Sequence, residues 1–313
     1  MNNSQEITVQ SAFPLSGTLT IPSEARTAHP AVLIISGSGK GDRDGNLKNL
    51  QMNMYKDLAE FLTGKGFVTF RYDKRGTYQS GGNFLEAGLN DLIEDAAACV
   101  KFLQSHPSVN SDQVLILGHS EGALIAPAVC KKVPVSGLIL LAGGAKSSKE
   151  LSDWQKAMAY VEMDHAKGFK GWLFRVLNAT EKAKKQDKKI FEKIVATDQS
   201  VMRVQGIKIN AKYLRETMAY NTADYLQEVE CPVLAITGDK DVQVPPEDVK
   251  LIAELVRGEA EWHIIPQMNH LMRKYEGNHT MLGLMKEYKT LADQPLDQDM
   301  LDKIEEWLEK YYK

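Results

Sequence analysis

Four short runs of apolar residues place the strongest limit on how this chain folds. They are AVLIIS (31–36), VLILG (114–118), GLILLAG (137–143) and PVLAITG (232–238). Runs this short and this uniformly apolar are typical of strands that are buried on both faces. The segments between them carry apolar residues at helical spacing, as Leu58, Phe61 and Leu62 do. The sequence therefore predicts an α/β fold with a mostly parallel, doubly wound sheet.

Further strands extend this pattern toward both ends of the chain. They are predicted at ITVQ (7–10), GTLTIP (17–22), FVTFRYD (67–73) and WHIIP (262–266). The alternation of strands and helices stops between residues 146 and 225, where the sequence is helix-like throughout and holds no clear buried strand. We expect a core formed by residues 1–145 and 226–313, with residues 146–225 inserted as a helical cap.

Composition excludes several classes of function. The formal net charge of the 313 residues is -3, so a nucleic-acid partner is not expected. No apolar run is long enough to span a bilayer, and the first ten residues lack the features of a signal peptide, so we expect no membrane partner and a cytoplasmic location. Cys99, Cys130 and Cys231 lie far apart and form no CxxC pair, which predicts free thiols and no metal site.

The run 114–118 leads into GHSEG (118–122), which matches the G-x-S-x-G pattern. A serine held on a tight strand-to-helix turn brings the residues two positions away into close contact, and Gly118 and Gly122 remove that clash. The helix that follows directs its first amide groups toward Ser120. The pattern and its context predict that Ser120 is a nucleophile.

A serine nucleophile needs a base and a carboxylate that orients the base. In this fold the expected chain order is serine, acid, histidine. GDKD (238–241) follows a predicted strand and offers Asp239 and Asp241, and His270 follows the strand at 262–266. His263 lies inside that strand, and His119 belongs to the elbow itself and is expected to point away from the reaction.

The loop SGSGKGDRDGN (36–46) has exposed backbone amides that can stabilise an oxyanion. It lacks the G-K-[ST] of a phosphate-binding loop, so neither a nucleotide nor another cofactor is expected.

These motifs, together with RYDKRGTYQSGG (71–82) and the Asn-His pair of PQMNH, resemble the α/β-hydrolase superfamily in its serine esterase branch. The resemblance covers residues 15–145 and 226–313. It implies that Ser120 is the nucleophile, Asp241 the acid and His270 the base. The backbone N–H groups of Ser38 and Glu121 would form the oxyanion hole.

The resemblance also separates supporting residues from reacting ones. It implies that Asp73 and Arg75 fix a loop. Asp42 and Arg43 are expected to touch substrate, to form a surface ion pair or to brace their loop. The chain departs from the family at Ser36-Gly37, where His-Gly is common.

The expected activity is that of a carboxylesterase acting on small or medium acyl esters, with a small-molecule acyl substrate as partner. A thioesterase, a serine aminopeptidase and a C–C bond hydrolase use the same triad and stay open as alternatives. A binding protein on a hydrolase scaffold is the alternative outside enzymes.

Overall fold

The computed structural model describes residues 3–24, 26–277 and 279–312, and its centre is a sheet of eight strands. The strands are β1 (Asn3–Gln10), β2 (Pro14–Ile21), β3 (His29–Ile35), β4 (Val68–Tyr72), β5 (Val109–His119), β6 (Gly137–Leu141), β9 (Val233–Gly238) and β10 (Ala260–Ile265). Their spatial order is β1-β2-β4-β3-β5-β6-β9-β10. β1 and β2 pair antiparallel, β2 pairs antiparallel with β4, and every pair from β4 to β10 is parallel. The predicted α/β fold with a mostly parallel sheet is confirmed.

Helices cover both faces of the sheet because successive strand residues point to opposite sides. On one face, α1 (Met54–Gly64) and α11 (Gln298–Tyr312) pack on residues such as Val32, Leu115 and Ile139. On the other face, α2 (Leu89–Ser105), α3 (Glu121–Lys132) and α9 (Asp248–Leu255) pack on Leu33, Ile116 and their neighbours. The apolar strand runs are thus buried on both sides.

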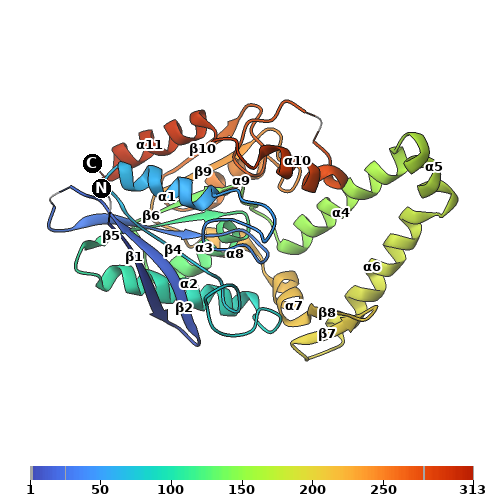
Figure 1. Ribbon diagram of the computed structural model, residues 1–313, viewed down its shortest axis with the longest axis horizontal. Helices are drawn as coiled ribbons and strands as arrows, with labels where there is room; N and C mark the ends of the chain where they lie inside the picture. Colours follow the sequence, from blue (N-terminus) through green and yellow to red (C-terminus); the bar gives the residue numbers. More distant parts are fainter. Residues whose placement is uncertain (1–2, 25, 278, 313) are drawn as a thin grey trace.

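The segment between β6 and β9 leaves this layered body (Figure 1). It contains α4 (Ser148–His165), α5 (Gly168–Val176), α6 (Ala179–Val195), β7 (Val201–Val204), β8 (Ile207–Asn210), α7 (Ala211–Ala219) and α8 (Thr222–Leu226). α4 runs outward, α5 forms the tip and α6 returns toward the body (Figure 1). We call α4–α6 the arm.

The expectation that this segment is helical throughout is wrong for residues 201–210. β7 and β8 form an antiparallel hairpin, with Val204 opposite Ile207. Gln205 and Gly206 occupy the turn with φ of 50° and 81°, the left-handed region that a two-residue hairpin turn requires. The alternation in VMRVQGIKIN was the signal for this hairpin, but the surrounding helical periodicity obscured it.

Candidate active site

The strand β5 ends in a sharp turn that presents Ser120 at the start of α3. Ser120 has φ 53° and ψ −115°, a conformation that costs a non-glycine residue about 1–3 kcal/mol. A Cβ added to Gly118 would collide with the backbone of Gly122, and one added to Gly122 would collide with the carbonyl oxygen of Ile35. The two glycines therefore allow the turn to form, in agreement with the sequence analysis.

His270 lies within hydrogen-bonding distance of the two side chains expected to act with it. His270 Nε2 is 3.0 Å from Ser120 Oγ, and His270 Nδ1 is 2.7 Å from Asp241 Oδ2. Asp241 lies in the loop after β9, and His270 lies in the loop after β10. Both loops leave the carboxyl ends of parallel strands, which is why residues 150 positions apart in sequence meet at one edge.

Asp241 is held so that only one of its oxygens serves the histidine. Its Oδ1 accepts the backbone N–H groups of Gln243 and Val244 at 2.8 and 3.0 Å. Its Oδ2 faces His270, and the carboxylate is fully buried. Asp239, the other candidate acid, is 42% exposed and accepts the amide of Gln267. The geometry therefore selects Asp241 over Asp239 as the partner of His270.

Asn269 and Arg273 shape the loop that carries His270. The sequence analysis included Asn269 only as part of a motif, with no role, and did not single out Arg273. Asn269 Oδ1 accepts the amides of Leu271 and Arg273, which closes a turn around the histidine. The buried Arg273 guanidinium donates to the carbonyl oxygens of Met52 and Ala292 at 2.5 and 2.7 Å. These bonds fix the loop to two distant parts of the chain.

The loop after β3 brings the Ser38 amide to the same edge. Neither the Ser38 N–H nor the Glu121 N–H donates a hydrogen bond to any acceptor within residues 3–24, 26–277 and 279–312. The neighbouring Gly37 N–H, by contrast, donates to the Tyr55 hydroxyl at 2.7 Å. The two amides predicted to form an oxyanion hole are thus both open to a ligand.

His119 does not point away from the reacting groups as expected. Its ring is buried, and its Nε2 lies 2.9 Å from the carbonyl oxygen of His270. Burial lowers the pKa of His119 to about 3, with a further decrease from the nearby His270, so the ring is neutral at physiological pH. Because a carbonyl only accepts, Nε2 carries the proton, and Nδ1 accepts from the Tyr55 hydroxyl at 2.9 Å. A chain of hydrogen bonds therefore joins Gly37, Tyr55, His119 and His270.

Lys74 is a further buried residue of the site that the sequence analysis did not single out. Its ammonium donates to the carbonyl oxygen of Gly37 at 2.5 Å and forms an ion pair with Glu121. The other Glu121 oxygen accepts from the hydroxyl of Tyr213 in α7. Burial raises the pKa of Tyr213, which keeps that hydroxyl protonated as a donor.

Asp42 and Arg43 have different surroundings. The Arg43 guanidinium is 8% exposed and pairs with Asp73 at 2.8 Å and Glu6 at 2.5 Å, so it braces its loop against β1 and the turn after β4. The Asp42 carboxylate accepts the amides of Asp44 and Asn46, and it also lines the cavity at Ser120.

Asp73 and Arg75 fix their loop, as expected. Asp73 accepts hydrogen bonds from Arg43 and from the amide of Gln79. Arg75 pairs with Asp95 of α2 at 2.7 Å and with Asp91 at 3.2 Å. Neither side chain lines the cavity at Ser120.

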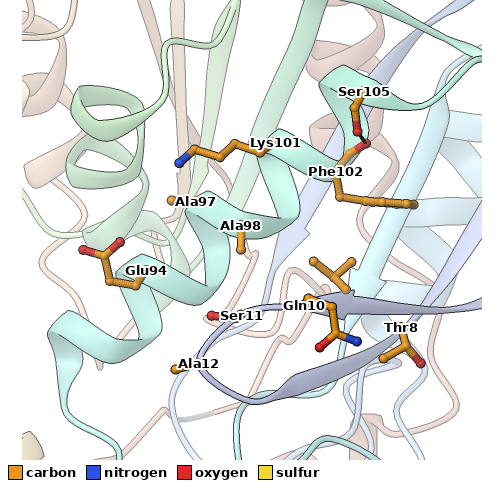
Figure 2. Close-up of a pocket in the computed structure, with 11 residues that line it drawn as sticks. Thr8, Gln10, Ser11, Ala12, Glu94, Ala97, Ala98, Lys101, Phe102 and Ser105 are labelled. Carbon is orange, nitrogen blue, oxygen red and sulfur yellow. Dashed lines mark hydrogen bonds between the residues drawn. The ribbon is translucent and has the colours of Figure 1, made fainter.

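The cavity at Ser120 has a volume of about 170 Å³, and its lining includes His270, Tyr55, Gln243 and Tyr288. A larger hollow of about 570 Å³ lies between the β1–β2 hairpin and α2 (Figure 2). Its lining includes Gln10, Glu94 and Lys101 but no histidine or cysteine. The smaller cavity is therefore the candidate active site, because it alone of the two contains a serine beside a histidine base.

No group of three His, Cys, Asp or Glu side chains among the described residues is arranged to hold a metal ion. Within the same residues, none of the helices has the length and apolar character that crossing a bilayer requires.

The sheet order and a serine elbow opposite a His–Asp pair define an α/β-hydrolase. Residues 49–274 match the model of the family described as serine aminopeptidase, S33, and the chain belongs to that family.

A relative with an esterase name is similar to nearly the whole of this chain. Esterase EstD from Thermotoga maritima is 27% identical over 298 residues, which cover 95% of this chain and 66% of EstD. This chain thus spans just under two thirds of the length of that relative.

Two solved structures share the fold at low sequence identity. One, Est1E from Butyrivibrio proteoclasticus with bound ferulic acid, has a TM-score of 0.59 at 18% identity and covers 92% of this chain and 98% of its own. The other, the esterase Pf2001 from Pyrococcus furiosus, has a TM-score of 0.58 at 16% identity and covers 100% of this chain and 91% of its own.

Proposed function

We propose that this protein is a serine hydrolase that cleaves carboxylic esters of small or medium acyl groups through an acyl-enzyme. The observation that carries the proposal is the pair of distances from His270 to Ser120 Oγ and to Asp241 Oδ2, 3.0 and 2.7 Å. The similarity to EstD, which is called an esterase, supports an ester as the substrate.

In the proposed reaction, each group of the site has its own role. His270 Nε2 takes the Ser120 proton as Oγ bonds to the ester carbonyl carbon, and the carbonyl oxygen becomes an oxyanion held by the amides of Ser38 and Glu121. The carbon–oxygen bond to the alcohol breaks, and His270 returns the proton to the departing oxygen. Water then attacks the acyl carbon with His270 again as base, the bond from that carbon to Ser120 Oγ breaks, and His270 returns the proton to Oγ as the acid departs. Asp241 holds the imidazole and stabilises its charged form throughout.

The test is the hydrolysis of p-nitrophenyl esters by the wild type and by Ser120→Ala. We expect kcat to fall by about 10⁴–10⁶ in the variant, the range seen when a nucleophilic serine is removed. Ser111→Ala, an exposed serine on β5, is the matched control and should keep wild-type activity. Retained turnover in Ser120→Ala would rule the proposal out.

Serine aminopeptidase is the second candidate, favoured by the description of the family. That activity needs a carboxylate for the substrate ammonium, and Asp42 is the carboxylate that lines the cavity at Ser120. Its oxygens already accept hydrogen bonds from Asp44 and Asn46 within its own loop. We therefore favour the ester, and aminoacyl p-nitroanilides in the same assay distinguish the two.

The location and partner belong to the same proposal. Three free cysteines support a cytoplasmic enzyme with a small-molecule acyl substrate. Fractionation of cells that express a tagged chain checks the location, and recovery in the membrane fraction would contradict it.

A further inference from the structure

Two separate cavities meet at the loop after β3. The cavity at Ser120, about 170 Å³, includes His270 in its lining. The other cavity, about 320 Å³, lies between the segment from Phe84 to Leu92 and the β8–α7 segment. Ser38 lines both cavities, whereas Glu121 lines only the second. The two predicted oxyanion donors therefore lie where the cavity at Ser120 and the second cavity meet.

The second cavity presents a mainly apolar wall. Its apolar lining residues are Phe84, Leu85, Ala87, Leu92, Ile209 and Leu214. Apart from Ser38, the polar side chains that line it already have partners in the protein. Lys74 and Tyr213 both bond to Glu121, and Asn210 donates to the carbonyl oxygens of Phe84 and Ala87 at 2.9 and 2.6 Å. Because few polar groups are left to pair with a ligand, the cavity suits an apolar group.

The proton transfers of ester cleavage decide which part of the substrate occupies which cavity. His270 must give its proton to the departing alcohol oxygen, so that oxygen lies within hydrogen-bonding reach of Nε2. His270 lines the cavity at Ser120 and not the second cavity. The alcohol therefore extends into the first, while the carbonyl oxygen lies at the amides of Ser38 and Glu121.

We propose that the second cavity binds the acyl group of the ester, an inference that rests on the proposed function. Its volume is roughly twice that of an engineered cavity of about 150 Å³ that holds benzene. The acyl group it fits is thus an alkyl or aryl group with about the bulk of one or two benzene rings. The cavity at Ser120 is near the size of one ring and takes the alcohol.

Leu214 offers the cleanest test because it lies on α7, half-buried at the cavity wall. We would measure kcat/KM for acetyl, butyryl and octanoyl p-nitrophenyl esters with Leu214→Trp and Leu214→Ala. We expect Leu214→Trp to lower the octanoyl-to-acetyl ratio of kcat/KM at least about tenfold, since one or two lost methylene contacts change discrimination by this much. Leu214→Ala should raise the ratio for longer acyl groups.

Two further variants make the comparison specific. Met285→Ala, in the lining of the cavity at Ser120, should change the preference among ethyl, butyl and benzyl acetates and leave the acyl ratio as it is. Leu177→Trp places the same substitution at an exposed residue of the arm that lines neither cavity, and both ratios should match the wild type.

Several outcomes would overturn the assignment. If Leu214→Trp changes the preference among alcohols and not among acyl groups, the two cavities are exchanged. If it changes neither preference, the second cavity is not part of the substrate site. Failure of the proposed function looks different, because then either the wild type hydrolyses no ester or Ser120→Ala keeps its activity.

Discussion

Lys74 occupies a position from which one ammonium group influences both candidate oxyanion donors. It holds the carbonyl oxygen of Gly37, and in a trans peptide the next N–H, that of Ser38, points the opposite way. The same ammonium pairs with the side chain of Glu121, whose own amide is the second donor. We therefore regard Lys74 as a positioning residue, acting through the two peptide groups that it anchors.

Replacing Lys74 with Met should lower kcat by about 10²-fold with a smaller change in KM, the loss typical of one missing oxyanion donor. Affinity for a trifluoromethyl ketone, whose adduct with Ser120 carries an oxyanion, should fall by the same factor as kcat/KM. The measurement is steady-state kinetics together with inhibition by this ketone.

Lys56→Met, at an exposed lysine of α1, is the control and should behave as wild type. A Lys74→Met enzyme that loses thermal stability but keeps its ketone affinity would show a structural role only.

At the scale of elements, the junction of β5 and α3 depends on close backbone approach. Gly122 packs against the carbonyl of Ile35 at the end of β3, so the elbow and the oxyanion loop are in direct contact. A side chain at this position would push the two loops apart. The junction is therefore as sensitive to volume as the interior of the core is.

We expect Gly122→Ala to lower the free energy of unfolding by about 1–3 kcal/mol, the usual cost of inserting a methyl group into a packed site. Gly64→Ala is the matched control, because a Cβ at this helical residue of α1 meets no atom within 4 Å. That variant should gain up to about 1 kcal/mol from its better helix propensity. Urea denaturation of both variants measures the two changes in the free energy of unfolding. Equal changes in Gly122→Ala and Gly64→Ala would contradict the prediction.

At this scale, the features that could be predicted from the sequence are those that a local pattern encodes. Apolar runs predicted the strands, and the motifs, together with the family resemblance that chose Asp241 over Asp239, predicted the meeting of Ser120, Asp241 and His270. Contacts between distant segments left no such trace. Lys74 joins Glu121 across 47 residues, and Tyr55 joins His119 across 64. The packing of the elements decides which lysine and which tyrosine become buried. Because packing is not encoded in a local motif or periodicity, these partners could not be identified from the sequence.

Over the whole molecule, the segment between β6 and β9 is attached to the body by two sets of contacts, one from the arm and one from α7. In the arm, Gln155 and Glu162 of α4 bond to the backbone of Gln243 and of Met281. In α7, Tyr213 contacts Glu121. The tip at α5 is different, with Trp172 52% exposed and Phe169 75% exposed. Its contacts are chiefly with α4 and α6.

We predict that limited trypsin digestion cuts first at Lys167 or Arg175, both exposed at this tip. Exposed segments with few buried contacts open locally at low free-energy cost, whereas the lysines of the core elements require global unfolding. Mass spectrometry of the first fragments locates the cut. Early cleavage within α2 or α11 would contradict the prediction.

The position of the arm in the chain has a practical consequence. Ser120 precedes the arm, while Asp241 and His270 follow it, so neither half of the chain has both a nucleophile and a base. If the chain is split between α4 and α5 and the two polypeptides are expressed separately, each would be inactive. Turnover would return only when the two polypeptides associate. Fused to two interacting proteins, such halves would convert an encounter between those proteins into a coloured product.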